Sequence, residues 1–159
     1  MVKPFKVNIS DQIINDIYEQ VKKYPWHEMP NDGGWEYGAN LDYMREFCTY
    51  WLDEYDWRSH EAAINRFSHY IAPVQGIDLH FIHEKGTGSS PLPLIISHGW
   101  PGSIVEFLHI IDQLAHPEKF GGKEEDALML SFRLCLDLDF RVILQNQLAQ
   151  EKWHQFLIY

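Results

Sequence analysis

The sequence predicts an α/β fold in which helices precede the first part of a sheet. Three observations support this prediction. Apolar residues recur at helical spacing before residue 65. The runs 67–74 and 77–83 favour two strands, joined by a turn at Gln75-Gly76. The run 92–114 predicts a strand, a tight turn and a helix, and since one such unit cannot complete a parallel sheet, further strands are expected downstream.

Three helices are expected in the helical part of the chain. Ser10 is a good N-cap for the first helix, and the second covers about 41–55. Ser59 is expected to cap a third, shorter helix. Residues 25–39 hold two Pro, three Gly and two Trp, which indicates a long loop whose aromatic residues pack. The apolar face of the first helix consists of Ile13, Ile14, Ile17, Tyr18 and Val21.

The run 92–114 carries the features of an anion-binding turn. Ser103 and Glu106 have the spacing of a capping box, which marks a helix start directly after the turn. Such a turn leaves backbone N–H groups unpaired at the carboxyl end of a strand, beside the positive end of a helix dipole. Proteins of the α/β class hold anions and oxyanions at such places.

The turn itself, His98-Gly99-Trp100-Pro101, has two interpretations. In the functional one, the Trp100 backbone N–H helps to form an oxyanion hole, Gly99 permits the tight turn, and Pro101, which has no N–H, fixes the shape. In the other, the residues form an ordinary strand–helix turn with a buried tryptophan, and His98 stabilises the turn rather than acting as a base. The four residues alone favour the ordinary turn.

Composition narrows the classes of function. The chain has 159 residues, the size of one domain, and 45% of them are hydrophobic, which is enough for a core. A formal net charge of −10 argues against a nucleic-acid partner. Cys48 and Cys135 are far apart and belong to no metal or redox motif, so a reducing, cytoplasmic setting is expected. Neither a signal peptide nor a run of roughly 20 apolar residues that could span a membrane is visible.

The sequence lacks the motifs of several other enzyme classes. Its nine histidines form no H-E-x-x-H pattern, so neither a metal nor a cofactor is predicted. A G-x-S-x-G nucleophile elbow and a P-loop are absent. Gly86-Thr87-Gly88 lacks the rest of a dinucleotide fingerprint and is expected to lie in a surface loop at 85–91.

A set of short motifs, in order along the chain, is more specific than any single one. Its members are Phe5-Lys6-Val7, Pro25-Trp26, Trp35-x-Tyr37-Gly38, Tyr50-Trp51, Asp56-Trp57-Arg58, Asn65-Arg66-Phe67, Gly76-Ile77-x-Leu79-His80-Phe81, His98-Gly99-Trp100-Pro101-Gly102-Ser103 and Glu106-Phe107. This set resembles the N-terminal region of the microsomal and juvenile-hormone type epoxide hydrolases, and the resemblance covers residues 3–127.

The resemblance implies a helical extension, residues 1–66, that wraps the core and lid. It implies that residues 67–127 are the first strands and first helix of an incomplete α/β-hydrolase sheet. In that family, which serves epoxide metabolism and detoxification, an Asp opens the epoxide and forms an ester with it. A His–acid pair then activates water to release the vicinal diol, while two lid tyrosines polarise the epoxide oxygen.

Only the oxyanion hole of this machinery maps onto the chain. The resemblance assigns it to the Trp100 backbone, with His98, Gly99 and Pro101 shaping the turn. The nucleophile, the catalytic His and its acid partner lie further downstream in the family, so no residue here is assigned to them. The chain is therefore expected to be inactive alone, with the missing C-terminal half as its partner and a small-molecule epoxide as the substrate of the full-length family.

Residues 128–159 do not continue the resemblance. Back-translated with permitted codons and read one base earlier, they give FDVIIPSLPGFGFS, the strand and loop that the family has at this position. We infer a frameshift near Ala127 and an out-of-frame tail. The strand at 92–97 is then expected to lack neighbours that would bury it on both sides. Within the poorly ordered tail, an accidental edge strand through Leu134, Leu136, Leu138 and Phe140 and a helix at 145–159 are conceivable.

A second hypothesis belongs to another class of function. The chain would be a free-standing helical interaction module that binds a partner through its aromatic loop at 25–39 and has no catalytic role.

Overall fold

The computed structural model describes residues 1–27, 34–74 and 76–133. The described residues from 8 to 61 form one unit, and residues 1–7 belong to the other unit together with the described residues from 62 to 133. The sequence places residues 1–7 in the helical extension, but in the structure they lie with the sheet because Lys3–Phe5 pairs with a later strand. Within the described residues, no helix combines the length and the apolar character needed to cross a membrane.

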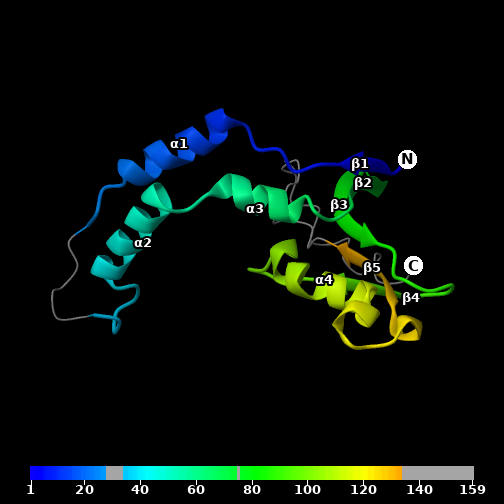
Figure 1. Ribbon diagram of the computed structural model, residues 1–159. Coiled ribbons are helices and arrows are strands. Elements are labelled where there is room, and N and C mark those ends of the chain that lie inside the picture. Colours follow the sequence, from blue (N-terminus) through cyan, green and yellow to red (C-terminus); the bar gives the residue numbers. More distant parts are fainter. Residues whose placement is uncertain (28–33, 75, 134–159) are drawn as a thin grey trace. The chain divides into compact units, whose positions relative to one another are not determined.

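The unit at 8–61 is helical (Figure 1) and contains α1 (Asp11–Lys22), α2 (Leu41–Asp53) and most of α3 (Trp57–Ile64). The predicted cap of α1 is confirmed, because the Ser10 side chain accepts a hydrogen bond from the Ile13 N–H at 3.3 Å. Asn40 caps α2 in the same way, through the Tyr43 N–H at 3.0 Å.

The predicted cap of the third helix is wrong. The helix begins at Trp57, and the Asp56 carboxylate accepts from the Arg58 N–H at 2.9 Å. The Ser59 hydroxyl instead donates to the Asp56 carbonyl, also at 2.9 Å. Both residues are good caps by type, and the upstream one acts because it lies where the chain turns into the helix.

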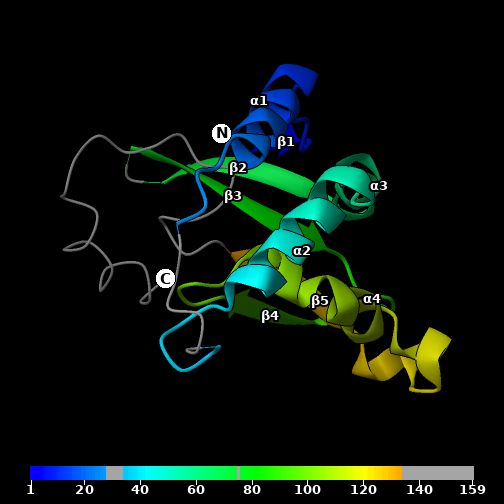
Figure 2. The same cartoon turned by 90° about the vertical axis from the view of Figure 1, so that its left-hand side faces the viewer.

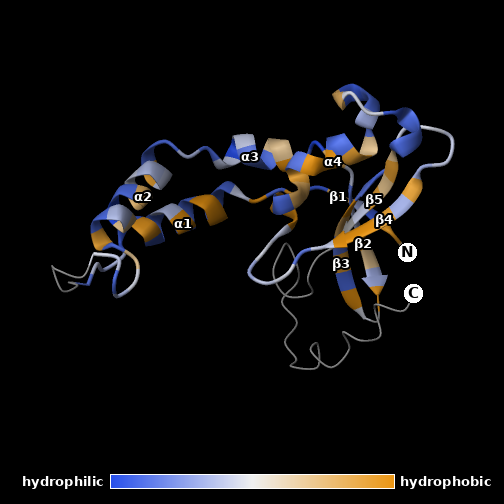
Figure 3. Ribbon diagram, turned by 90° about the horizontal axis from the view of Figure 1, so that it is seen from below, coloured by the Kyte–Doolittle hydropathy of each residue, from blue (hydrophilic) through white to orange (hydrophobic). Residues whose placement is uncertain are grey.

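The apolar faces of α1 and α2 are not buried among the described residues. Neither helix contains a buried residue. Figure 3 shows hydrophobic positions alternating with hydrophilic ones along both helices, as the predicted amphipathic pattern requires. The large side chains left exposed include Ile13, Tyr43, Phe47 and Tyr50.

The other unit holds a five-stranded mixed sheet of order β1-β2-β3-β5-β4. Its strands are β1 (Lys3–Phe5), β2 (His69–Val74), β3 (Ile77–Glu84), β4 (Leu92–Ser97) and β5 (Leu128–Arg133). The predicted strand pair is confirmed: β2 and β3 run antiparallel and side by side (Figure 2). β4 runs parallel to β5, which makes the sheet mixed.

Strand β5 differs from the expectation for the segment after Ala127. It lies between β3 and β4, and its Leu130 is fully buried. β4 therefore has a neighbour on one side, while its other side is an edge of the sheet as described. Main-chain pairing accepts any residues that alternate suitably, so this segment can fill the position whatever its origin. The edge strand and helix considered for the rest of the tail lie outside the described residues.

The core forms where one helix covers a face of the sheet. Helix α4 (Leu108–Ala115) follows the 3-10 turn η1 (Ile104–Phe107) and lies across β4 and β5 (Figures 1 and 2). Further 3-10 turns, η2 (Pro117–Phe120) and η3 (Glu124–Asp126), lead from α4 to β5. Each large side chain buried here contributes about 1.5–3 kcal/mol. The buried cluster is Phe67, Ile77, Leu79, Ile82, Ile104, Ile111, Ala115 and Leu130.

Asn65 fastens the end of β1 beside the end of α3. Its side-chain oxygen accepts from the Val7 N–H at 2.9 Å, and its side-chain nitrogen donates to the Val7 carbonyl at 2.8 Å. Val7 is buried, so water cannot easily replace either bond. One amide side chain thus performs the role of a neighbouring strand.

We predict that Asn65→Ala lowers the free energy of unfolding by about 2 kcal/mol, since it leaves two main-chain groups of Val7 without partners. Urea denaturation followed by circular dichroism measures the change. Asn15→Ala, at an exposed position of α1, is the matched control and should change stability by less than about 0.5 kcal/mol. Equal effects of the two substitutions would contradict the role given to Asn65.

A second prediction tests whether β5 occupies its place in the sheet. A Cβ atom added to Gly86 would overlap the main-chain carbonyl of Leu128, so Gly86→Ala has to displace β5 or the loop. We expect a loss of about 1–3 kcal/mol in unfolding free energy. Gly99→Ala is the control, because a Cβ there meets nothing within 4 Å. If Gly86→Ala proves as mild as the control, Leu128 does not lie against this loop.

Candidate functional site

The candidate site is the turn 98–102, which connects the end of β4 to η1. The Gly102 N–H donates to the Gly99 carbonyl at 2.7 Å and closes the turn. The peptide bond between Trp100 and Pro101 is cis. The turn therefore lies where the sequence places it, at the carboxyl end of a strand that is parallel to its neighbour.

His98 is a buried part of this turn. Its Nδ1 lies 3.1 Å from the Gly99 carbonyl oxygen, which can only accept a hydrogen bond, so Nδ1 carries the proton in this contact. The imidazole thereby holds the peptide group that the Gly102 N–H also uses.

The exposure of the Trp100 side chain distinguishes the two interpretations of the motif. Its side chain is 77% exposed, so the interpretation as a turn built around a buried tryptophan is wrong for this structure. Within the described part of the chain, the Trp100 backbone N–H donates to no acceptor. The turn thus presents one main-chain donor of the kind that an oxyanion requires.

The residues after the turn fix its second half. The Ser103 side chain accepts from the Val105 N–H at 3.1 Å, and the Glu106 carboxylate accepts from the Ser103 N–H at 2.8 Å. This is the predicted capping box. It opens a 3-10 turn rather than an α-helix, however, and the α-helix starts one turn later at Leu108.

Glu106 also borders the site, which the sequence pattern did not reveal. A Cβ atom on Gly102 would overlap the Glu106 carboxylate, so this carboxylate occupies the space of the missing side chain. The capping-box spacing identified Glu106 only as the start of a helix. The same spacing could have suggested its position, because a carboxylate that reaches back to residue 103 must pass over residue 102.

An open hollow of about 310 Å³ lies over the turn, lined by Gly99, Trp100, Pro101, Gly102 and Glu106. Among the described lining residues, Glu106 alone carries a carboxylate, and this carboxylate already accepts a hydrogen bond from the Ser103 N–H. The hollow offers a main-chain donor but, among the described residues that line it, no acid–base pair that could activate water. This arrangement can stabilise a negative charge.

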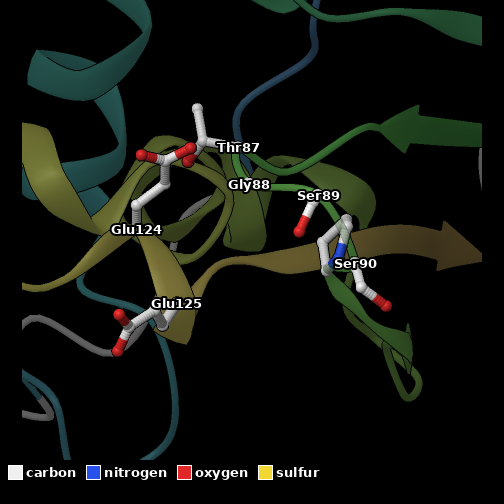
Figure 4. Close-up of a pocket in the computed structure, with 7 residues that line it drawn as sticks. Thr87, Gly88, Ser89, Ser90, Glu124 and Glu125 are labelled. Atoms are coloured by element: carbon white, nitrogen blue, oxygen red, sulfur yellow. The ribbon is translucent and has the colours of Figure 1, made fainter.

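A second hollow, of about 360 Å³, lies at the loop before β4 (Figure 4). Thr87, Gly88, Ser89 and Ser90 line it from one side and the carboxylates of Glu124 and Glu125 from the other. The Thr87 hydroxyl lies 2.8 Å from the Glu118 carboxylate. Carboxylates at this position disfavour a phosphate group.

The described residues contain no group of three or more His, Cys, Asp or Glu side chains that could hold a metal ion. The two histidines of β3 have different surroundings. His80 is buried and lies edge-on to Phe5. His83 is half-buried and contacts the Ser131 hydroxyl at 3.0 Å.

Comparison with known proteins gives consistent matches. The family described as "Epoxide hydrolase N terminus" matches residues 2–107. The chain is 35% identical over 128 residues to epoxide hydrolase 1 of Sus scrofa, which covers 78% of this chain and 28% of that protein. It is 37% identical over 120 residues to juvenile hormone epoxide hydrolase 1 of Ctenocephalides felis, covering 73% of this chain and 26% of that protein.

A solved structure is similar as well. The juvenile hormone epoxide hydrolase of the silkworm Bombyx mori superposes with a TM-score of 0.72 at 26% sequence identity, over 84% of this chain and 31% of the silkworm chain. The predicted fold class, the beginning of an α/β-hydrolase sheet with a helical extension, is confirmed by this similarity. The chain spans less than a third of the length of these relatives.

We predict that the Glu106 carboxylate holds the Trp100 N–H in place. Glu106→Ala removes the acceptor of the Ser103 N–H, which should cost about 1 kcal/mol in unfolding free energy and shift the backbone amide resonance of Trp100 in ¹H–¹⁵N spectra. Glu106→Gln keeps an acceptor oxygen and serves as the matched control, with a smaller effect on both quantities. An unchanged Trp100 resonance in the alanine variant would show that Glu106 does not shape the turn.

Proposed function

Because the chain belongs to the epoxide hydrolase N-terminus family, we propose that it is the N-terminal part of an enzyme that converts an epoxide and water to a vicinal diol. Its contribution is the turn His98-Gly99-Trp100-Pro101, which supplies one side of an oxyanion hole. The observation that carries the proposal is the Trp100 backbone N–H, which lies at the carboxyl end of β4 without an acceptor among the described residues.

The proposed role follows from the chemistry of ester hydrolysis. In this family an Asp carboxylate opens the epoxide ring and becomes an ester, and water then attacks the ester carbonyl carbon. The carbonyl oxygen gains a negative charge in that step, and the Trp100 N–H donates a hydrogen bond to it. Removing one such donor typically costs about 2.7–4 kcal/mol of transition-state stabilisation.

The other residues of the motif have supporting roles in this proposal. His98 donates to the Gly99 carbonyl and so orients the peptide plane that precedes Trp100. Pro101 has no N–H, so it adds no donor beside the Trp100 N–H, and its ring restricts the chain that follows. Gly99 is exposed and has open space around its Cα, which leaves room for a substrate group close to the main chain.

The proposal includes the inactivity of this chain by itself. Of the described residues that line the hollow over the turn, Glu106 alone has a carboxylate, and that carboxylate serves as a helix cap. Ring opening needs a free carboxylate nucleophile, and hydrolysis of the ester needs a base, usually a histidine. An additional segment of the same family would have to supply both groups. The substrate is then a neutral small-molecule epoxide, and the cytoplasmic setting expected from the sequence stays a prediction.

We also keep the out-of-frame origin of residues 128–159 as a proposal. It is supported by the coherent stretch that appears when the back-translated segment is read one base earlier. The position of β5 is compatible with it, because the segment forms a strand through main-chain pairing and a few alternating apolar residues. Sequencing the gene through codon 127 and beyond decides the matter, and a reading frame that agrees with the protein as printed would overturn the proposal.

The activity itself gives a direct prediction. Purified chain incubated with a neutral aryl epoxide should form diol no faster than buffer, measured by chromatography of the products. Adding a separately expressed C-terminal half of a homologous epoxide hydrolase should restore turnover, and Trp100→Pro, which lacks the N–H, should lower the restored rate. Turnover by the chain alone would contradict the proposed inactivity, and restored turnover that ignores the proline substitution would contradict the role of Trp100.

One observation favours the interaction module as the second candidate. The described parts of α1 and α2 expose several large apolar side chains, as binding surfaces do. Hydrogen exchange on the monomeric chain separates the two candidates. Protected amides throughout residues 25–39 would favour the module, and rapid exchange there would favour the enzyme part.

A further inference from the structure

Two buried histidines form a direct contact inside the sheet and take no part in the proposed site. His69 on β2 is 4% exposed and His80 on β3 is 1% exposed. The Nδ1 atom of His69 lies 2.9 Å from the Nε2 atom of His80, and the two rings are nearly parallel, with an interplanar angle of 5°. The Nε2 atom of His69 lies 2.8 Å from the Ile64 carbonyl oxygen at the end of α3.

These contacts determine where the protons lie. A carbonyl oxygen only accepts, so His69 must donate from Nε2 to Ile64. In a neutral His69 the Nδ1 atom is then an acceptor, and His80 donates to it from Nε2. The contact between the rings therefore holds one proton. The Ile64 carbonyl fixes the tautomer of His69, and His69 in turn fixes the tautomer of His80.

The same geometry distinguishes the first added proton from the second. If His69 gains a proton, its Nδ1 becomes a donor, and His80 can accept by moving its own proton to Nδ1. If both rings are protonated, the two nitrogen atoms that face each other at 2.9 Å are both donors and both rings are charged. The contact cannot survive that state, because like charges in a buried place repel without a hydrogen bond to offset the repulsion.

Uncharged groups contact the pair from two elements. From β1 the pair meets Phe5, which has no charge, and from α3 it meets the Ile64 carbonyl. Glu84 on β3 is the charged group that acts on His69, and its carboxylate already accepts from the Ser68 N–H. Burial lowers the pKa of His69, and burial together with His69 lowers the pKa of His80 to about 4.

We propose that His69 and His80 form an acid-sensitive latch, which joins β2 and β3 to the end of α3 while it holds one proton between the rings and opens when both rings are protonated. The proposal does not depend on the proposed enzymatic function. It concerns the sheet alone and applies whether the chain is part of an enzyme or an interaction module.

The direction of the pH dependence follows from linkage. Both pKa values are lower in the folded chain than the value of about 6.5 in an unfolded one, so the open state binds more protons below pH 6.5. The stabilisation by the pair is complete above that pH and is lost as the pH falls toward 4. Each proton that binds only to the open state shifts the equilibrium between the closed and open states about tenfold per pH unit. Two such protons shift it about 100-fold per pH unit, as long as the closed pair has not yet accepted its first added proton.

The wild-type chain provides the first test. Long-range ¹H–¹⁵N spectra of the histidine rings report the tautomers, and urea unfolding between pH 7.5 and 4.5 reports the linked protons. At pH 7.5 we expect both His69 and His80 to be protonated at Nε2. Just below pH 6.5 we expect the equilibrium constant for unfolding to change by more than about tenfold per pH unit. Two rings that titrate independently near pH 6.5 with the fold intact would overturn the latch.

Variants separate the pair from the other histidines. His80→Gln keeps a side-chain N–H that can donate to His69 and removes one titrating ring. The equilibrium constant for unfolding should then change by at most about tenfold per pH unit. His109→Gln removes an exposed histidine of α4 and should keep the wild-type dependence. If the His80 variant does not fold, the ring spectra of the wild type still decide, and a His80 variant with the full wild-type dependence would refute the proposal.

Discussion

The sheet of this chain depends on the pairing of β5 with two strands at once. β3 runs antiparallel to β5 and β4 runs parallel to it. β3 and β4 do not pair with each other in the described sheet, so they are joined through β5. Leu130 then joins the core beneath α4, which fixes the helix that follows the turn. The position of the Trp100 N–H is thereby linked to a strand some 30 residues further along the chain.

A recurring device in this structure is a polar side chain that serves main-chain groups at the end of an element. Asn65 binds both main-chain groups of Val7, and Glu106 binds the N–H of Ser103. His69 does the same for the Ile64 carbonyl. In each case the backbone has left its regular pattern and needs a partner that the pattern no longer supplies. The side chains that look functional by type are therefore partly structural, and the donor proposed for a ligand is a main-chain group.

Local patterns allowed several features to be predicted correctly from the sequence. The Ser10 cap, the β2–β3 hairpin and the capping box of Ser103 and Glu106 all involve residues that are close in sequence. The sequence predicts Ser59 as the cap of α3, whereas Asp56 caps it. Both residue types are suitable caps, and only the position where the backbone enters the helix distinguishes them. The α-helix begins later than predicted because the capping box closes a 3-10 turn first.

The sequence by itself determined the class of fold, the family and the position of the turn, since these depend on periodicity and on ordered short motifs. Only the tertiary structure decided that Trp100 is exposed and His98 buried, that residues 128–133 lie between β3 and β4, and that His69 contacts His80. The physical reason is the same for all three. Burial and strand order depend on contacts between segments far apart in the chain, and such contacts leave no periodic signal in the sequence around each residue.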